Sequence, residues 1–177
     1  MRIIGLAAGI AALALGGMAR AEVVEASPTG FQVKQSAEIA APADKVWAAL
    51  GQVGSWWDSQ HTWSGDAKNL TLVLKAGDCL CEANLPGGGN ARHMTVVLVM
   101  PGKTVIFEGA LGPLMESGAA GHMVWSLAEK DGRTTLTQAY FVGGYYPGGL
   151  DKLAGPVDGV MGHQLARLKA YVETGKP

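Results

Sequence analysis

The sequence is poor in cysteine and has no dominant charge. Its 177 residues include two cysteines, and 14 Lys and Arg are nearly balanced by 15 Asp and Glu. Two cysteines cannot build the disulfide framework of a small secreted domain, so stability must come from an apolar core. No basic run or stripe is present, which argues against nucleic acid or an anionic membrane as the main partner.

Several signatures of organisation and catalysis are also missing. The sequence contains no internal repeat, low-complexity tract or long linker, which indicates one domain over residues 22–177. It has no nucleophile elbow and no readable Ser-His-Asp arrangement. The segment "PGGGN" lacks the lysine and the following helix of a phosphate-binding loop, so it is predicted to be a hairpin turn.

Residues 1–21 have the pattern of a secretory signal. Arg2 precedes an apolar run from Ile3 to Leu15, and Ala19 and Ala21 supply the small residues that signal peptidase reads. The run is shorter than the roughly 20 residues of a membrane-spanning helix, so no stable membrane anchor is expected. The pattern predicts cleavage after Ala21 and a periplasmic or secreted protein.

The remaining chain reads as a strand, two short helices and then a series of strands. After a short tail, "FQVKQSAEIAA" alternates as a strand does. "APADKVWAAL" has helical spacing, and "GQVGSWWDSQHTWSG" reads as a break, an aromatic helical turn and a loop. Six strands linked mostly by tight turns follow, so we expect an antiparallel sheet. Their segments are "NLTLVLKAG", "DCLCEAN", "HMTVVLVM", "KTVIFEGAL", "HMVWSLAEK" and "TTLTQAYFV".

The last segment, residues 150–173, is predicted to be a long amphipathic helix. Its apolar residues recur at steps of three and four, and Pro156 marks either a kink or the true start. His163, Arg167 and Lys169 fall off the apolar stripe, so we expect them to meet water. The concave face of a curved sheet is the only large partner for that stripe, and such a sheet leaves a cavity beside the helix.

This order of elements resembles the helix-grip fold of the START / Bet v 1-like (SRPBCC) superfamily, in particular its polyketide-cyclase and Hsp90-activator-homology branches. The matching segments are "AEIAAPADKVWAAL", "SWWDS", "PGKTVIFEG", "VWSLAEKDGRTTLTQAY" and "VDGVMGHQLARLKAYVE". The resemblance implies an α+β fold in which a curved antiparallel sheet wraps around a long C-terminal helix. It also implies a cavity for lipids, sterols or polyketides, and it transfers no catalytic residue. The co-chaperone role of one branch does not fit an exported protein.

The paired cysteines of "DCLCEAN" allow three interpretations. Side chains alternate along a strand, so Cys79 and Cys81 share one face while Asp78 and Glu82 share the other. Because acids favour water, we expect the cysteines to face inward as free thiols that line the cavity.

A disulfide and a metal site are the alternatives. Two residues along a strand separate the α-carbons by roughly 6.6 Å, near the upper end of the disulfide range of about 4.4–6.8 Å. Such a bridge suits an oxidising compartment and would allow a redox role. Thiolates of Cys79 and Cys81 with His61 or His93 would instead suit a soft metal ion.

The histidines and tryptophans supply the other candidate residues. His61 is expected at the cavity rim, as a polar contact for a ligand, as an acid–base group, or simply as a surface residue. His93 and His122 each stand at a strand start, where exposure is expected. The tryptophans are core or cavity wall, with an aromatic ligand clamp as the alternative.

Together these features predict an exported binding protein for a small hydrophobic ligand, with no cofactor and no resident metal. One alternative is a polyketide-cyclase-like enzyme in which His61 and Glu82 or His93 move protons. The other is a metal or redox site at the two cysteines. The predicted ligand-binding residues are Trp57, His61, Trp63, Cys79, Cys81, Trp125, Tyr140 and Met161.

Overall fold

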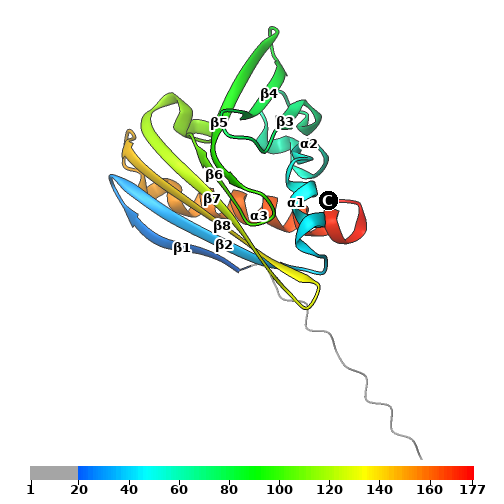
Figure 1. The fold of residues 1–177 in the computed structure, drawn as a ribbon. Coiled ribbons are helices and arrows are strands. Elements are labelled where there is room, and N and C mark those ends of the chain that lie inside the picture. The colour runs from blue at the N-terminus through cyan, green and yellow to red at the C-terminus, as the bar shows by residue number, and fades with distance from the viewer. Residues whose placement is uncertain (1–19) are drawn as a thin grey trace, which may run out of the picture.

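The computed structural model describes residues 20–177, which form one antiparallel sheet and a set of helices (Figure 1). Residues 1–19 of the predicted signal peptide lie outside the described residues. The strands are β1 Arg20–Ser27, β2 Gly30–Ile39, β3 Leu70–Leu72, β4 Cys79–Leu85, β5 Gly89–Met100, β6 Thr104–Glu108, β7 Gly118–Lys130 and β8 Arg133–Tyr145. The α-helices are α1 Ala43–Leu50, α2 Val53–Trp56 and α3 Asp151–Thr174, and the 3₁₀ turns are η1 Ser59–His61, η2 Ala67–Asn69 and η3 Gly112–Glu116.

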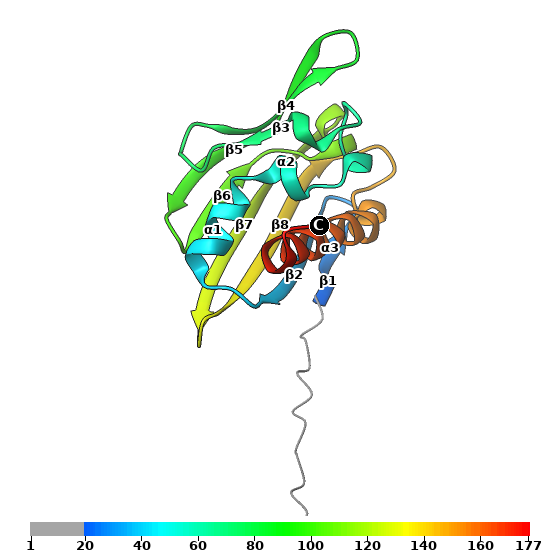
Figure 2. The ribbon, with the colours of Figure 1, turned by 90° about the vertical axis from the view of Figure 1, so that its right-hand side faces the viewer.

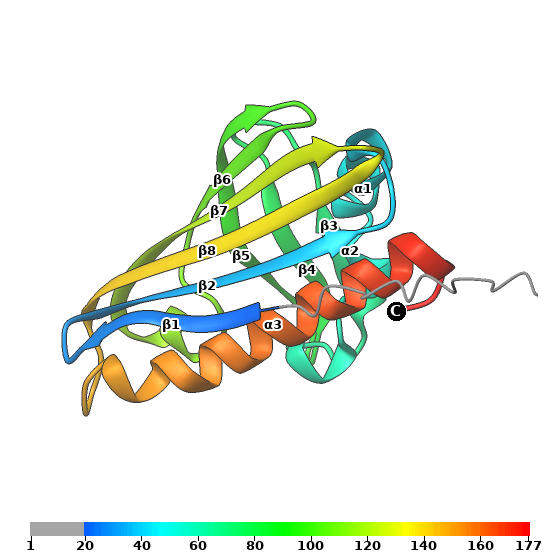
Figure 3. The same cartoon turned by 90° about the horizontal axis from the view of Figure 1, so that it is seen from below.

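The strands are ordered β1-β2-β8-β7-β6-β5-β4-β3, and every neighbouring pair is antiparallel. The six strands predicted after the short helices are all present, and "PGGGN" does join β4 to β5 as a hairpin. The sheet bends around the space that holds α3 (Figure 3). The fold is therefore the predicted α+β helix-grip arrangement.

Strand β1 corrects the prediction of a short N-terminal tail. It forms a hairpin with β2 that closes at the Ser27–Gly30 pair. Residues Glu22–Ala26 are exposed on both faces of the strand. No buried face requires apolar residues at every second position, so the alternation that indicates a strand is missing from this segment. Pairing with β2, rather than burial of side chains, places β1 at the edge of the sheet.

Helix α3 lies along the β1–β2 side of the sheet, whereas α1 and α2 cover the other part of its concave face (Figures 2 and 3). The buried residues of α3 face the sheet and include Met161, Leu165 and Leu168. Pro156 lies inside α3, which begins at Asp151, so of the two alternatives for this proline the helix start is wrong. His163 is exposed as expected, but Arg167 is half-buried and donates to the carbonyl oxygens of Trp56 and Trp57.

The core combines large aromatic side chains with a buried amide pair. Trp125 is 1% exposed, and its Nε1 donates to Gln138 Oε1 at 2.8 Å. Gln138 Nε2 in turn donates to Gln35 Oε1 at 3.2 Å and to the carbonyl oxygen of Met161 at 3.3 Å. This chain of bonds joins β7, β8 and β2 to α3, so it fixes the position of the helix under the sheet.

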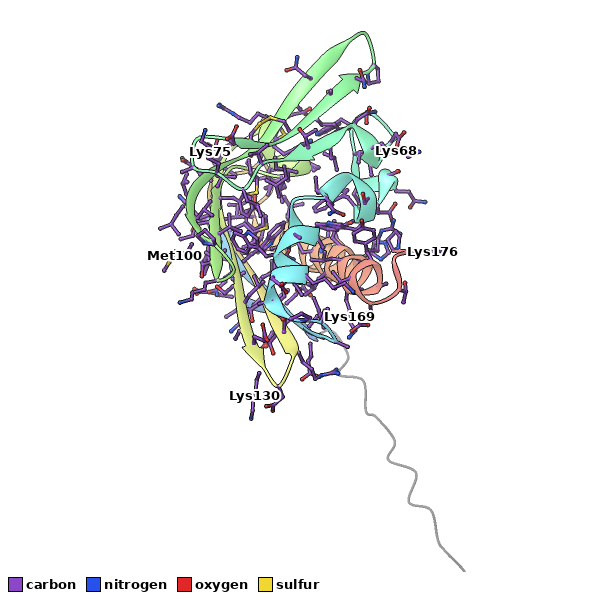
Figure 4. All side chains as sticks on the ribbon, turned by 45° about the vertical axis from the view of Figure 1, so that its right-hand side comes forward. Lys68, Lys75, Met100, Lys130, Lys169 and Lys176 are labelled. Atoms are coloured by element: carbon purple, nitrogen blue, oxygen red, sulfur yellow. A yellow bond between two sulfur atoms is a disulfide. The ribbon has the colours of Figure 1, made fainter. Side chains whose placement is uncertain are left out.

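Side chains fill most of the space between the sheet and the helices (Figure 4). Lysines such as Lys68, Lys75 and Lys130 lie at the periphery, as expected for charged groups that need water. Among residues 20–177, no helix is both long enough and apolar enough to span a membrane.

Candidate functional site

A cavity of about 440 Å³ lies between the first half of α3 and the sheet. The contribution of α3 is apolar and comes from Leu153, Pro156, Val157, Val160 and Met161. These residues recur at helical spacing, so the face of α3 that covers the sheet also forms the cavity wall.

The other walls come from two loop segments and from the sheet. Residues 57 and 60–63, after α2, supply two tryptophans, and residues 111–114 around η3 supply mainly aliphatic groups. The sheet contributes Leu70, Leu80 and His93. Most of the lining is apolar, so the few polar side chains decide which ligand groups can be matched. Those polar side chains are Gln60, His61, Thr62 and His93.

Of the eight predicted ligand-binding residues, four line this cavity: Trp57, His61, Trp63 and Met161. The structure brings them together from the segment after α2 and from α3. Trp63 is 43% exposed, whereas Trp57 and Met161 are buried. Whether these residues bind a ligand stays a prediction.

Trp125 and Tyr140 lie in the core and are not among the cavity-lining residues. The Tyr140 hydroxyl accepts from the backbone N–H of Leu111 and donates to the carbonyl oxygen of Gly109. Burial raises the pKa of Tyr140 to about 12, although the hydrogen bond from Leu111 acts in the opposite direction. Tyr140 therefore supports the segment before η3 rather than touching the cavity.

The prediction that Cys79 and Cys81 are inward-facing free thiols is wrong. They form a disulfide, with 5.3 Å between their α-carbons, and they are half-buried. Leu80 and Glu82 occupy the inward face instead, at 2% and 1% exposed. The separation is shorter than the value expected for a regular strand, and the β4–β5 register shifts at this point.

The bridge also bears on the metal alternative. Both sulfurs are committed to the disulfide, so neither is available as a thiolate ligand. Within residues 20–177, no group of three or more His, Cys, Asp or Glu side chains is placed to hold a metal ion.

His93 is buried, which contradicts the expectation that it is exposed. Leu80 pairs with Met94, but Cys81 pairs with Arg92, so His93 is the extra residue of a β-bulge. His93 and Met94 are consequently both buried, at 7% and 1% exposed, although they are adjacent in the strand. The bulge places an imidazole on the inner face, where it lines the cavity.

Glu82 is the partner of His93 and the most heavily bonded acid in the site. His93 Nε2 lies 2.8 Å from Glu82 Oε2. The backbone N–H groups of Trp63 and Ser64 donate to the same carboxylate, at 3.1 and 2.6 Å. Burial acts to raise the pKa of Glu82, but the hydrogen bonds from Ser64, Trp63 and His93 outweigh it and hold that pKa below its ordinary value. Glu82 is therefore an ionised, buried carboxylate that fixes both His93 and the segment that carries Trp63.

His61 belongs to a second polar group, at the end of the cavity near α3. Gln164 Oε1 accepts from the backbone N–H of Asp58, so its Nε2 is the atom that donates to His61 Nδ1, at 3.0 Å. This bond leaves the proton of a neutral His61 on Nε2. The backbone N–H of Gln60 and the side chain of His163 both bond Asp58, and they lower the pKa of its carboxyl.

Glu82 and His93 are predicted from the sequence only as acid–base candidates of the alternative function, and it is missed that they face inward as a bonded pair. The bulge leaves no local pattern in the sequence. The three donors to Glu82 leave none either, because two are backbone N–H groups 18 and 19 residues away and the third, His93, lies 11 residues away on the next strand. The two short polar turns before β3 are also missed, although Asp58 and Asp66 cap them.

A comparison with protein families matches residues 30–173 to the family described as polyketide cyclase / dehydrase and lipid transport. The chain belongs to this family. The match covers the chain from β2 nearly to the end of α3, and therefore all the cavity walls. No curated protein matches the chain.

Solved structures show the same fold at low sequence identity. A protein from Rhodobacter sphaeroides has a TM-score of 0.59 at 18% identity, covering 86% of this chain and 98% of its own. CalU16 from Micromonospora echinospora has a TM-score of 0.58 at 14% identity, covering 90% of this chain and 84% of its own. DynU16, from the dynemicin biosynthetic locus, has a TM-score of 0.58 at 22% identity, and the match spans 82% of this chain but only 48% of DynU16.

Proposed function

We propose that this protein binds a small hydrophobic molecule, of lipid or aromatic polyketide type, in the cavity between the sheet and α3. The observation that carries the proposal is a cavity of about 440 Å³ whose lining is mostly apolar. Membership of a family described by polyketide cyclisation, dehydration and lipid transport supports the same chemistry.

The binding proposal is tested by filling the cavity. The wild-type protein is expected to bind a lipophilic fluorescent dye with a dissociation constant on the order of micromolar. Val157→Trp places an indole in the cavity wall, so the dissociation constant should rise by at least about tenfold. Val97→Trp is the matched control, because Val97 is 42% exposed and lies outside the cavity. Equal dye binding by the two variants, or none by the wild type, would contradict the proposal.

The proposed location is the periplasm or the exterior of the cell, on the pattern of residues 1–21. An intact mass of the protein isolated from its native host tests this location. We expect a chain that begins at Glu22 and is lighter by two hydrogen atoms than its reduced form, because Cys79 and Cys81 are bridged. A chain that retains residues 1–21, or that carries two free thiols, would count against export into an oxidising compartment.

A second candidate function is acid–base catalysis on an oxygenated polyketide-like substrate, because His61 and His93 line one cavity. His93 Nδ1 would take a proton from a carbon between two carbonyls, and the electron pair would move onto a carbonyl oxygen near a donor such as His61 Nε2–H. A bound 1,3-dicarbonyl should then exchange that hydrogen for deuterium faster than in buffer. Exchange at the buffer rate, with the compound shown to be bound, would exclude this candidate.

A further inference from the structure

One nitrogen atom in the cavity wall, on His93, has no hydrogen-bond partner in the part of the chain that the structure describes. His93 Nε2 is bonded to Glu82, whereas Nδ1 makes no hydrogen bond to any residue in the range 20–177. In that range no buried side-chain nitrogen or oxygen is left without a partner, so Nδ1 must be accessible. Because His93 is only 7% exposed and lines the cavity, the accessible side of Nδ1 faces the cavity.

The hydrogen bonds of Glu82 determine whether His93 Nδ1 is a donor or an acceptor. The Glu82 carboxylate already accepts two backbone N–H groups, and an ionised carboxylate can only accept hydrogen bonds. In its contact with Glu82, His93 Nε2 must therefore be the donor and carry a proton. In the neutral imidazole, Nδ1 then carries a lone pair and acts as a hydrogen-bond acceptor. If a ligand proton moves onto Nδ1, the resulting imidazolium is stabilised by the carboxylate behind it.

The β-bulge in β5 turns the His93 side chain toward the cavity. A regular β5 would carry His93 to the outer face, and the extra residue is what brings it inward next to Met94. The other residues that the sheet contributes to the cavity wall, Leu70 of β3 and Leu80 of β4, are aliphatic. His93 Nδ1 is therefore the acceptor that the sheet presents to a largely apolar cavity.

We propose that His93 selects ligands in which an apolar ring system carries an acidic hydroxyl group, a phenol or an enol. This inference rests on the proposed binding function and adds the chemical class of the ligand. A purely apolar ligand would displace water from Nδ1 and leave it unpaired, which costs roughly tenfold or more in affinity. A phenolic or enolic O–H donates to Nδ1 and avoids that loss.

A matched pair of probes tests the selection. 2-Naphthol and 2-methoxynaphthalene share one ring system, but only 2-naphthol can donate a hydrogen bond. Titration of the wild-type protein should show 2-naphthol binding about tenfold or more tightly than the ether. Equal affinities would overturn the selection while leaving the binding function intact. Binding of neither probe, with no dye bound, would overturn both.

Two variants assign the preference to His93. His93→Phe removes the acceptor and keeps an aromatic ring, so the ratio of the two affinities should fall to near one. His122→Phe makes the same change at an exposed histidine outside the cavity, and the ratio should stay at the wild-type value. A wild-type ratio in His93→Phe would contradict the assignment.

A measurement on the wild type keeps the proposal testable if His93→Phe does not fold. With four histidines in the chain, nitrogen-15 spectra can resolve the tautomer of each ring. We expect His93 to carry its proton on Nε2 when free, and its Nδ1 signal to shift with 2-naphthol but not with the ether. A proton on Nδ1 of the free protein, or no shift with bound 2-naphthol, would overturn the proposal.

Discussion

Glu82→Gln is expected to lower the free energy of unfolding by about 3 kcal/mol. The carboxylate is buried and accepts from His93, Trp63 and Ser64. Glutamine has nearly the same shape, but its amide nitrogen is a donor and would face one of these three donors. The three donors would also lose an ionised acceptor, and a hydrogen bond to a charged group contributes about 1.5–3 kcal/mol.

Denaturant unfolding of the wild type and of two variants measures this effect. Glu38→Gln is the matched control, because Glu38 is bonded to Arg133 in an ion pair whose side chains are 47% and 43% exposed. Such exposed pairs contribute at most about 1 kcal/mol. Equal losses in the two variants would show that the bonds to Glu82 do not stabilise the site.

The pH dependence gives a second check on the same residue. The pKa of Glu82 in the folded chain lies below its ordinary value of 4.5. A lowered pKa means that the stability contributed by the carboxylate is present above pH 4.5 and is lost as the pH falls through the folded pKa. The difference in unfolding free energy between wild type and Glu82→Gln should therefore narrow in acid. A difference that stays constant through this range would contradict the assignment of an ionised carboxylate.

Glu82 also shows where sequence reasoning fails in this fold. Alternation along β4 correctly divides its residues into two faces, but polarity assigns the faces the wrong way round. The rule that acids face water holds only when no donors are buried with them, and here the donors come from the segment before η2. The wrong orientation predicted for the cysteines has the same cause. Cys79 and Cys81 lie on the face of β4 opposite Glu82, so placing Glu82 outward places them inward.

Elsewhere the sequence predicts the fold well, because the periodic signal is strong. Strand β2 alternates strictly between buried and less buried residues, and α3 repeats apolar residues at helical spacing. Strand β1 has no such signal, since both of its faces are exposed. The burial of His93 is mispredicted for a different reason. A β-bulge shifts the alternation of inward and outward side chains by one residue, and the sequence alone does not show where the bulge lies.

Trp125→Ala is expected to lower the free energy of unfolding by about 3–5 kcal/mol, whereas Trp63→Ala should cost less than about 1 kcal/mol. Trp125 is 1% exposed and packs against Phe107, so its loss leaves a void and removes the donor to Gln138.

Trp63 is 43% exposed and lines the cavity, so its removal should instead weaken dye binding in a protein that stays folded. Unfolding and dye titration of both variants separate the two roles. The reverse pattern, in which Trp63→Ala unfolds the protein and Trp125→Ala only weakens dye binding, would contradict both assignments. The two residues belong to the same predicted set and differ only in the surroundings that the fold gives them. Burial beside Gln138 makes Trp125 structural, and the short turns after α2 leave Trp63 free to meet a ligand.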